Sequence, residues 1–125
     1  MCWKSSVSAT TWRDTLASYS NYGAGLDIAA PGGLCYSNTT PEGCIYSAYP
    51  GGGYAYLQGT SMAAPQVTGT AAIVASKAGL RGSALRTRLL GTADDLGAAG
   101  YDTKFGNGRV NTYRAVTGSS APAGQ

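Results

Sequence analysis

One helix that is apolar on almost every side constrains this chain more than any other feature. Residues 62–78 are mostly alanine, valine, isoleucine, glycine and threonine, with Pro65 close to the predicted first turn and Gly79 directly after the last. A proline costs least in the first turn of a helix, and glycine commonly ends one. Because such a helix has no polar face to present to water, we expect it to lie in a protein interior.

Three short apolar runs precede this helix and predict strands, at Val7–Thr10, residues 26–30 and residues 54–57. The intervening residues 34–53 are rich in Gly, Pro, Asn and Tyr, which predicts one long loop of the kind that is usually functional or mobile. The third strand runs straight into Gly59, Thr60 and Ser61. The apolar helix is therefore expected to follow a strand and a glycine turn.

Two shorter helices are expected after it. Ser83 is a suitable N-cap for a helix that Gly91 closes, and Asn111 is a suitable N-cap for a last helix that reaches Val116. The small and polar residues 118–125 predict a flexible tail.

Composition excludes several classes of partner. The 125 residues suffice for one domain, only 12% of them are charged, and the net charge is +3. Arg81, Arg86 and Arg88 form the one local basic cluster, which we interpret as a solvated helix face rather than a track for phosphates. The sequence has no run of about 18 apolar residues, the length needed to span a membrane. Its first residues lack the apolar core of a signal peptide. We therefore expect no nucleic-acid or membrane partner and no signal peptide in this chain.

The three cysteines leave two interpretations open. Cys35 and Cys44 flank a segment rich in turn residues, so a disulfide could close it, but two free thiols fit the sequence nearly as well. With no histidine and no C-x-x-C pair, the sequence predicts no zinc site.

Ser61 is the candidate nucleophile. At the start of a helix, unpaired N–H groups and the helix dipole favour negative charge, so the Ser61 N–H is a candidate donor to an oxyanion. Topology alone favours a simpler role for Ser61, as the N-cap of the helix. The G-x-S-x-G elbow of other hydrolases does not fit, because Ala63 stands where the last glycine would be.

The sequence around Ser61 favours its interpretation as the nucleophile. Residues 59–65, GTSMAAP, followed by Val67 and Gly69, resemble the nucleophile segment of subtilisin-like serine peptidases, the subtilases. Further segments resemble the same family in the same order, from about Val7 to Val116: residues 16–23, 27–32, 92–97 and 105–111. Gln66 stands where many members carry a histidine that is not part of the catalytic triad.

The resemblance implies an α/β fold, a three-layer αβα sandwich with a mainly parallel sheet, of which residues 1–117 are the C-terminal portion. It implies a secreted or extracellular serine endopeptidase with polypeptide substrates. Ser61 would be the nucleophile, and Gly59 and Thr60 would contact substrate. No cofactor is expected, although the complete enzyme could bind calcium.

The family triad also needs an Asp from a D-[ST]-G segment and a His from an H-G-T segment, and this sequence has neither. A serine hydroxyl without a general base is a weak nucleophile, so we expect the chain alone to be inactive. Lys77 lies roughly 24 Å along the helix from Ser61, too far to act as base, and Lys104 has no supporting motif. The missing part, in cis or in trans, is thus an expected partner. A non-catalytic remnant, a binding module and one half of a split protease remain alternatives.

Two further groups have open interpretations. Asp94, Asp95 and Asp102 could suggest a calcium site, but their spacing fits turn or cap roles better. Tyr49, Tyr54 and Tyr56 could line a substrate cleft or serve only in packing, and the sequence favours neither. Asp27 is not assigned as the triad acid, because no histidine is present for it to orient.

Overall fold

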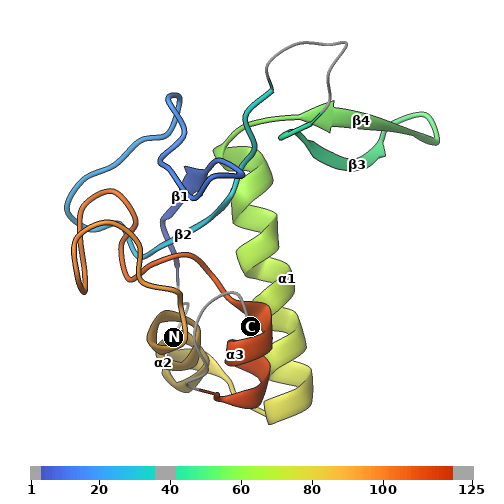
Figure 1. The fold of residues 1–125 in the computed structure, drawn as a ribbon. Helices are drawn as coiled ribbons and strands as arrows, with labels where there is room; N and C mark the ends of the chain where they lie inside the picture. Colours follow the sequence, from blue (N-terminus) through green and yellow to red (C-terminus); the bar gives the residue numbers. More distant parts are fainter. Residues whose placement is uncertain (1–3, 36–41, 120–125) are drawn as a thin grey trace.

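A computed structural model describes residues 4–35 and 42–119. Its elements, shown in Figure 1, are listed here in chain order: β1 Val7–Thr10, β2 Ile28–Pro31, β3 Ile45–Tyr49, β4 Gly53–Leu57, α1 Thr60–Ala78, α2 Gly82–Gly91 and α3 Thr112–Thr117. The predicted strand over Val7–Thr10 and the long helix are confirmed. The second strand begins two residues later than predicted, at Ile28.

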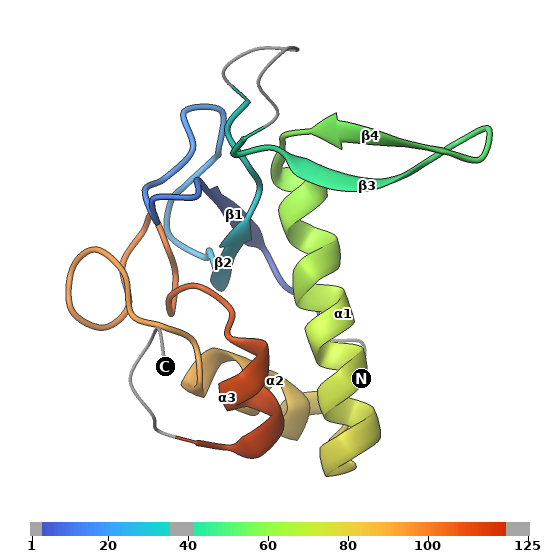
Figure 2. The same ribbon diagram turned by 45° about the vertical axis from the view of Figure 1, so that its right-hand side comes forward.

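The centre of the molecule is a parallel strand pair crossed by one helix. β1 and β2 pair in parallel, with Val7 opposite Ile28 and Thr10 opposite Pro31. A single parallel bridge between Ala29 and Arg109 adds the C-terminal segment to the other side of β2. Helix α1 packs on both strands, and the views in Figures 1 and 2 agree on this arrangement. The chain is therefore a partial α/β fold with a parallel sheet, as predicted.

Only one side of α1 is covered in this structure. Its fully buried residues, Ala63, Val67, Thr70 and Val74, recur every three or four positions and so form one face. Elsewhere the helix is open, and the side chain of Ile73 is 46% exposed. The prediction of an interior helix therefore holds for one face of α1, and the elements described here leave the other faces open.

The C-terminal half of α1 shares a second small core with α2 and α3. Val74, Leu89 and Ala115 are buried together, one from each helix. Asn111 caps α3 as predicted, since its side chain accepts a hydrogen bond from the Arg114 N–H. Ser83 does not cap α2, which begins at Gly82 after Arg81 and has no side-chain cap.

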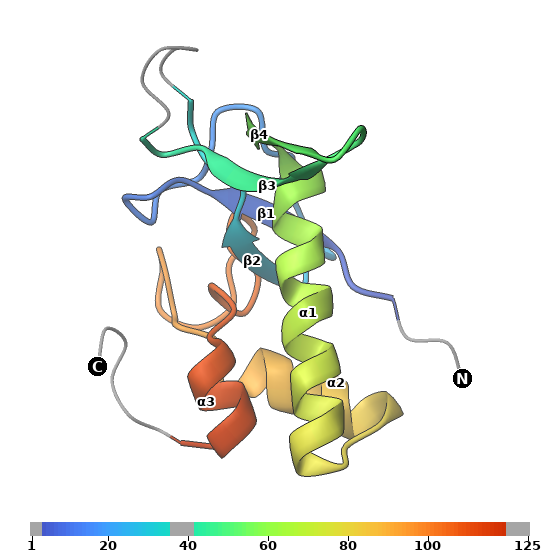
Figure 3. The same ribbon diagram turned by 90° about the vertical axis from the view of Figure 1, so that its right-hand side faces the viewer.

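Residues 34–53 do not form one loop. Strands β3 and β4 make an antiparallel hairpin, with Ile45 opposite Leu57 and Tyr49 opposite Gly53. The strand β3 was missed because turn residues, Gly43, Pro50 and the glycines at 51–53, lie on either side of this short run. In Figure 3 the hairpin lies over the N-terminal end of α1.

Two statements concern the periphery of the chain. Within residues 4–35 and 42–119, no helix combines the length and apolar character that crossing a membrane requires. Of the predicted flexible tail, residues 120–125 lie outside the described residues, and Gly118 is the left-handed residue that ends α3.

Candidate active site

Ser61 is the second residue of α1 and does not cap it. Gly59 precedes the helix with φ 151°, a conformation that favours glycine, and no side chain accepts a hydrogen bond from the first turn. The interpretation of Ser61 as an N-cap is therefore wrong. The side chain of Ser61 is exposed, and its hydroxyl has no hydrogen bond to another described residue.

Two backbone donors at this helix end remain available. The N–H groups of Met62 and Ala63 donate to the Gly59 carbonyl, at 3.0 and 3.3 Å. The N–H groups of Thr60 and Ser61 have no acceptor among the described residues. An anion placed beside Ser61 would therefore meet free N–H groups and the positive end of the helix dipole.

Close backbone packing fixes the position where α1 begins. The Gly59 N–H donates to the Gly32 carbonyl at 2.9 Å. A Cβ on Gly32 would lie 2.5 Å from the Ala9 Cβ and 2.8 Å from the Gly59 carbonyl oxygen, so only glycine fits. The Tyr19 hydroxyl donates to the neighbouring Gly33 carbonyl at 2.6 Å. Burial raises the pKa of Tyr19, which keeps this hydroxyl a neutral donor.

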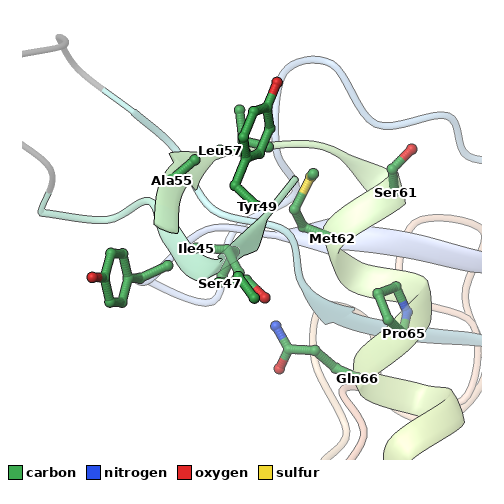
Figure 4. A pocket seen from close by; sticks show the side chains of 11 residues that line it. Ile45, Ser47, Tyr49, Ala55, Leu57, Ser61, Met62, Pro65 and Gln66 are labelled. Carbon is green, nitrogen blue, oxygen red and sulfur yellow. The ribbon is translucent and has the colours of Figure 1, made fainter. Parts of the chain in front are cut away.

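A groove of about 490 Å³ opens beside Ser61, between α1 and the β3–β4 hairpin. Figure 4 shows its lining, which includes Ile45, Ser47, Tyr49, Ala55 and Leu57 from the hairpin and Ser61, Met62, Pro65 and Gln66 from α1. The hairpin side of the groove carries no charged residue. A largely apolar groove ending at an exposed hydroxyl has the dimensions and chemistry of a ligand site.

The three candidate tyrosines separate in the structure. Tyr49 lines the groove, whereas Tyr54 and Tyr56 do not. Both contact Tyr46, which also lines the groove: the Tyr54 ring stacks on it with centroids 5.3 Å apart, and the Tyr56 ring is tilted against it at 4.6 Å. Packing is thus the role of Tyr54 and Tyr56, and a cleft position remains for Tyr49.

Several groove residues escaped sequence reasoning. Gln66 was noted only as a departure from the family pattern, but its Nε2 donates to the Pro31 carbonyl at 2.7 Å and so joins α1 to the end of β2. Ile45, Leu57 and Pro65 reach the groove only because the hairpin folds over α1. The β-branched and aromatic residues Ile45, Tyr46 and Tyr49 were the one signal that could have indicated strand β3.

The other candidate bases lie away from Ser61. Lys77 is in the last turn of the same helix. Lys104 belongs to a different cavity, which shares no lining residue with the groove. Asp27 accepts hydrogen bonds from the Ser6 N–H at 3.0 Å and from Arg86 at 2.6 Å. None of these groups is within the groove.

The aspartates have structural roles. Asp95 accepts from the Gly100 N–H, and Asp102 accepts from the N–H groups of Lys104 and Phe105. Asp94 differs from the predicted turn role, because its buried carboxylate pairs with Arg109 at 2.6 Å and Arg114 at 3.0 Å.

The Asp94 pairing also sets its ionisation. Burial raises the pKa of Asp94, but hydrogen bonds from Arg109, Asn111 and Arg114 together outweigh it and hold the pKa below its ordinary value. The described residues contain no group of three His, Cys, Asp or Glu side chains that could hold a metal ion.

Cys35 and Cys44 are joined by a disulfide, with 4.9 Å between their Cα atoms. The basic cluster of α2 is also occupied within the chain. Arg81 donates to the Ala75 carbonyl near the end of α1, Arg88 donates to the Ala115 carbonyl, and Arg86 pairs with Asp27. All three arginines thus have partners within the chain, while Arg81 stays exposed and Arg86 and Arg88 stay partly exposed, as a solvated helix face requires.

A parallel strand pair and a helix whose second residue is an exposed serine define the chain as an α/β protein with a free hydroxyl at a helix N-terminus. Comparison with known families gives the particular one. The Subtilase family matches residues 4–108, and the chain belongs to that family.

Individual relatives agree. The chain is 42% identical over 110 residues to thermitase of Thermoactinomyces vulgaris, covering 88% of this chain and 35% of thermitase. It is 41% identical over 111 residues to subtilisin Savinase of Lederbergia lenta, covering 88% of this chain and 36% of that protein. Halolysin of Haloferax mediterranei is 40% identical over 114 residues, 89% of this chain and 19% of its own length.

Solved structures show the same fold. A lanthipeptide protease superposes with a TM-score of 0.77 at 31% identity, over 90% of this chain and 40% of its own. A protease from Pseudoalteromonas arctica superposes with a TM-score of 0.76 at 34% identity, over 93% of this chain and 36% of its own. The chain thus spans about a third of the length of thermitase and subtilisin Savinase, the curated relatives most fully covered here.

Proposed function

We propose that this chain is the nucleophile-bearing part of a serine endopeptidase, with Ser61 as the nucleophile. The observation that carries the proposal is the exposed Ser61 hydroxyl beside two unpaired N–H groups at the start of α1. A cap or a packing residue would have its hydroxyl bonded or buried. Membership of the subtilase family and the GTSMAAP wording support the same assignment.

In the proposed reaction, the Ser61 oxygen attacks the carbonyl carbon of a substrate peptide bond. Its proton passes to a base, and the resulting oxyanion accepts a hydrogen bond from the Ser61 N–H. The tetrahedral intermediate expels the amine, which takes the proton, and leaves an ester on Ser61. Water then hydrolyses the ester. Gly59 and Thr60 do not line the groove, and their proposed contact with the substrate backbone rests on the family resemblance. Tyr49 and Leu57, which do line it, would contact substrate side chains.

The base must come from outside this chain. The sequence contains no histidine, and both Lys77 and Lys104 lie away from the groove. We therefore propose that the chain alone is inactive and that further polypeptide, in cis or in trans, supplies the base and the triad acid. The open side of α1 supports this, because exposed apolar side chains such as Ile73 are typical of a helix face that another element covers.

Export of the complete protein is part of the proposal. The Cys35–Cys44 disulfide supports an oxidising compartment, where such bonds persist. A calcium site is not proposed within this chain, since Asp94, Asp95 and Asp102 are engaged with arginines or backbone N–H groups and the described residues contain no cluster of three possible ligands.

Labelling with a fluorophosphonate probe tests the function. The chain alone should not be labelled, because no base activates Ser61. The same chain placed behind the part of thermitase that precedes the matched segment should be labelled, and Ser61→Ala should abolish the label. Rapid stoichiometric labelling of the chain alone would contradict the proposed inactivity. Failure of the correctly folded fusion to label would favour the non-catalytic alternative.

A further inference from the structure

One side chain connects the segment before Ser61 to a distant loop. The Cys35 N–H donates to the Gln58 Oε1 at 2.6 Å. A backbone N–H can only donate, so the oxygen of the Gln58 amide must face Cys35. Gln58 follows the last residue of β4 and precedes Ser61 by only three positions.

The Cys35 end of this contact is held firmly. The disulfide to Cys44 closes a ring in which the Cα atoms of the two cysteines are 4.9 Å apart. Beside it, the Leu34 N–H donates to the Gly43 carbonyl at 2.7 Å. Residues 34–35 and residues 43–44 are therefore joined twice, once covalently and once by a hydrogen bond.

The Gln58 end leads directly to the helix. The next residue, Gly59, donates its N–H to the Gly32 carbonyl at 2.9 Å and accepts from the Met62 N–H at 3.0 Å. Two successive residues, Gln58 and Gly59, are thus tied to residues 35 and 32 of the same neighbouring segment. Together these bonds determine where the first turn of α1, and with it Ser61, is placed.

We propose that Gln58 is a positioning residue for Ser61, and that the Cys35–Cys44 disulfide is the anchor through which it acts. The inference rests on the proposed function, because it assigns a role in placing the nucleophile. Without the Gln58 contact, the turn keeps only its Gly59 bond, and the Ser61 hydroxyl and N–H sample more positions. Acylation depends on the alignment of the Ser61 hydroxyl and N–H with the substrate carbonyl, so loss of the Gln58 contact slows acylation.

Two substitutions of equal chain length separate the hydrogen bond from the shape of the side chain. Gln58→Met fills similar space but offers only a weak sulfur acceptor, whereas Gln58→Glu keeps an oxygen acceptor for the Cys35 N–H. A third variant, Cys35→Ala with Cys44→Ala, removes the anchor and leaves Gln58 in place. A packing role would be affected equally by Met and Glu, while a positioning role would be rescued by Glu.

The experiment measures the rate of fluorophosphonate labelling of Ser61 in the thermitase fusion. We expect Gln58→Met to slow labelling about two- to tenfold, which corresponds to one neutral hydrogen bond, and Gln58→Glu to stay within about twofold of the parent. The double cysteine variant should slow labelling to a similar extent. Combining it with Gln58→Met should add little, because both changes break the same connection.

The outcomes are distinguishable from failure of the function itself. Labelling of Gln58→Met at the parent rate, or equal slowing by Met and Glu, would overturn the proposal while leaving Ser61 as nucleophile. If the parent fusion is not labelled, the proposed function fails instead. Amide hydrogen exchange in the chain alone then decides the coupling: Gln58→Met, but not Gln58→Glu, should speed exchange at Cys35, Gly59 and Met62, whose N–H groups are hydrogen-bonded in the parent. Exchange in Gln58→Met at the parent rate would refute the positioning role of Gln58.

Discussion

The carbonyl of Gly32 accepts a hydrogen bond from the N–H of Gly59, at 2.9 Å, and so joins the end of β2 to the start of α1. This contact brings the parallel strand pair and the Ser61 helix together at one point. It is possible only because Gly32 has no side chain. The position of Ser61 therefore depends on a residue 29 positions earlier in the sequence.

The first prediction concerns that close approach. Gly32→Ala should lower the free energy of unfolding by about 1–3 kcal/mol, because its Cβ would overlap Ala9 and the Gly59 carbonyl. Urea denaturation measures the change. The matched control is Gly69→Ala, on the exposed side of α1 with nothing within 4 Å of an added Cβ. It should stabilise the chain by up to about 1 kcal/mol, and equal effects of the two substitutions would contradict the packing argument.

The second prediction separates chemistry from stability at Ser61. Since the side chain is exposed and its hydroxyl unbonded, Ser61→Ala should change the free energy of unfolding by less than about 0.5 kcal/mol. The same substitution should remove all probe labelling in the fusion. Thermal melting of the parent and variant gives the comparison, and a large loss of stability would mean that Ser61 has a structural role after all.

The third prediction concerns the buried ion pairs of Asp94. Asp94→Ala leaves Arg109 and Arg114 without that partner and should cost about 3 kcal/mol, at the low end for a broken buried pair because both arginines are partly exposed. Asp95→Ala is the matched control, since Asp95 is exposed and accepts one hydrogen bond. It should cost no more than about 1 kcal/mol. Urea titrations of both variants at pH 7 measure the two losses of stability. A larger loss for Asp95→Ala than for Asp94→Ala would contradict the prediction.

The fourth prediction follows from the lowered pKa of Asp94. In the unfolded chain this carboxyl titrates near pH 3.9. Around that pH the unfolded state binds more protons than the folded state, so stability rises with pH. The contribution is complete above the unfolded pKa and is lost as pH falls through the folded pKa. Urea midpoints measured from pH 6 down to pH 2.5 should fall more steeply for the parent than for Asp94→Ala, and parallel curves would exclude the linkage.

Local sequence signals located most elements correctly. The apolar run of the long helix, the glycine after it and the Asn111 cap each depend on neighbouring residues, so they can be recognised without a structure. Ser61 belongs to the same category, because its segment carries a family-specific wording. Ser83 was misassigned as a cap because the helix begins one residue earlier, at Gly82, so that Ser83 lies inside its first turn.

The groove could not be predicted, because it depends on contacts between distant segments. β3 contributes to it only after the hairpin folds over α1, and Gln66 acquires its role through a bond to Pro31. The same holds for Gln58 and Cys35, which are 23 residues apart. No periodicity within either segment reports such pairings.

The sequence by itself determined that this chain belongs to the subtilase family and has no histidine, and it predicted Ser61 as the nucleophile, since these depend on residue identity and order. Only the tertiary structure decided that Ser61 is exposed rather than capping, that one side of α1 is open, and that Gln58 and Gly59 are tied to residues 35 and 32. The physical reason is that burial and hydrogen-bond partners are set by packing between segments far apart in the chain, and identity alone does not specify them.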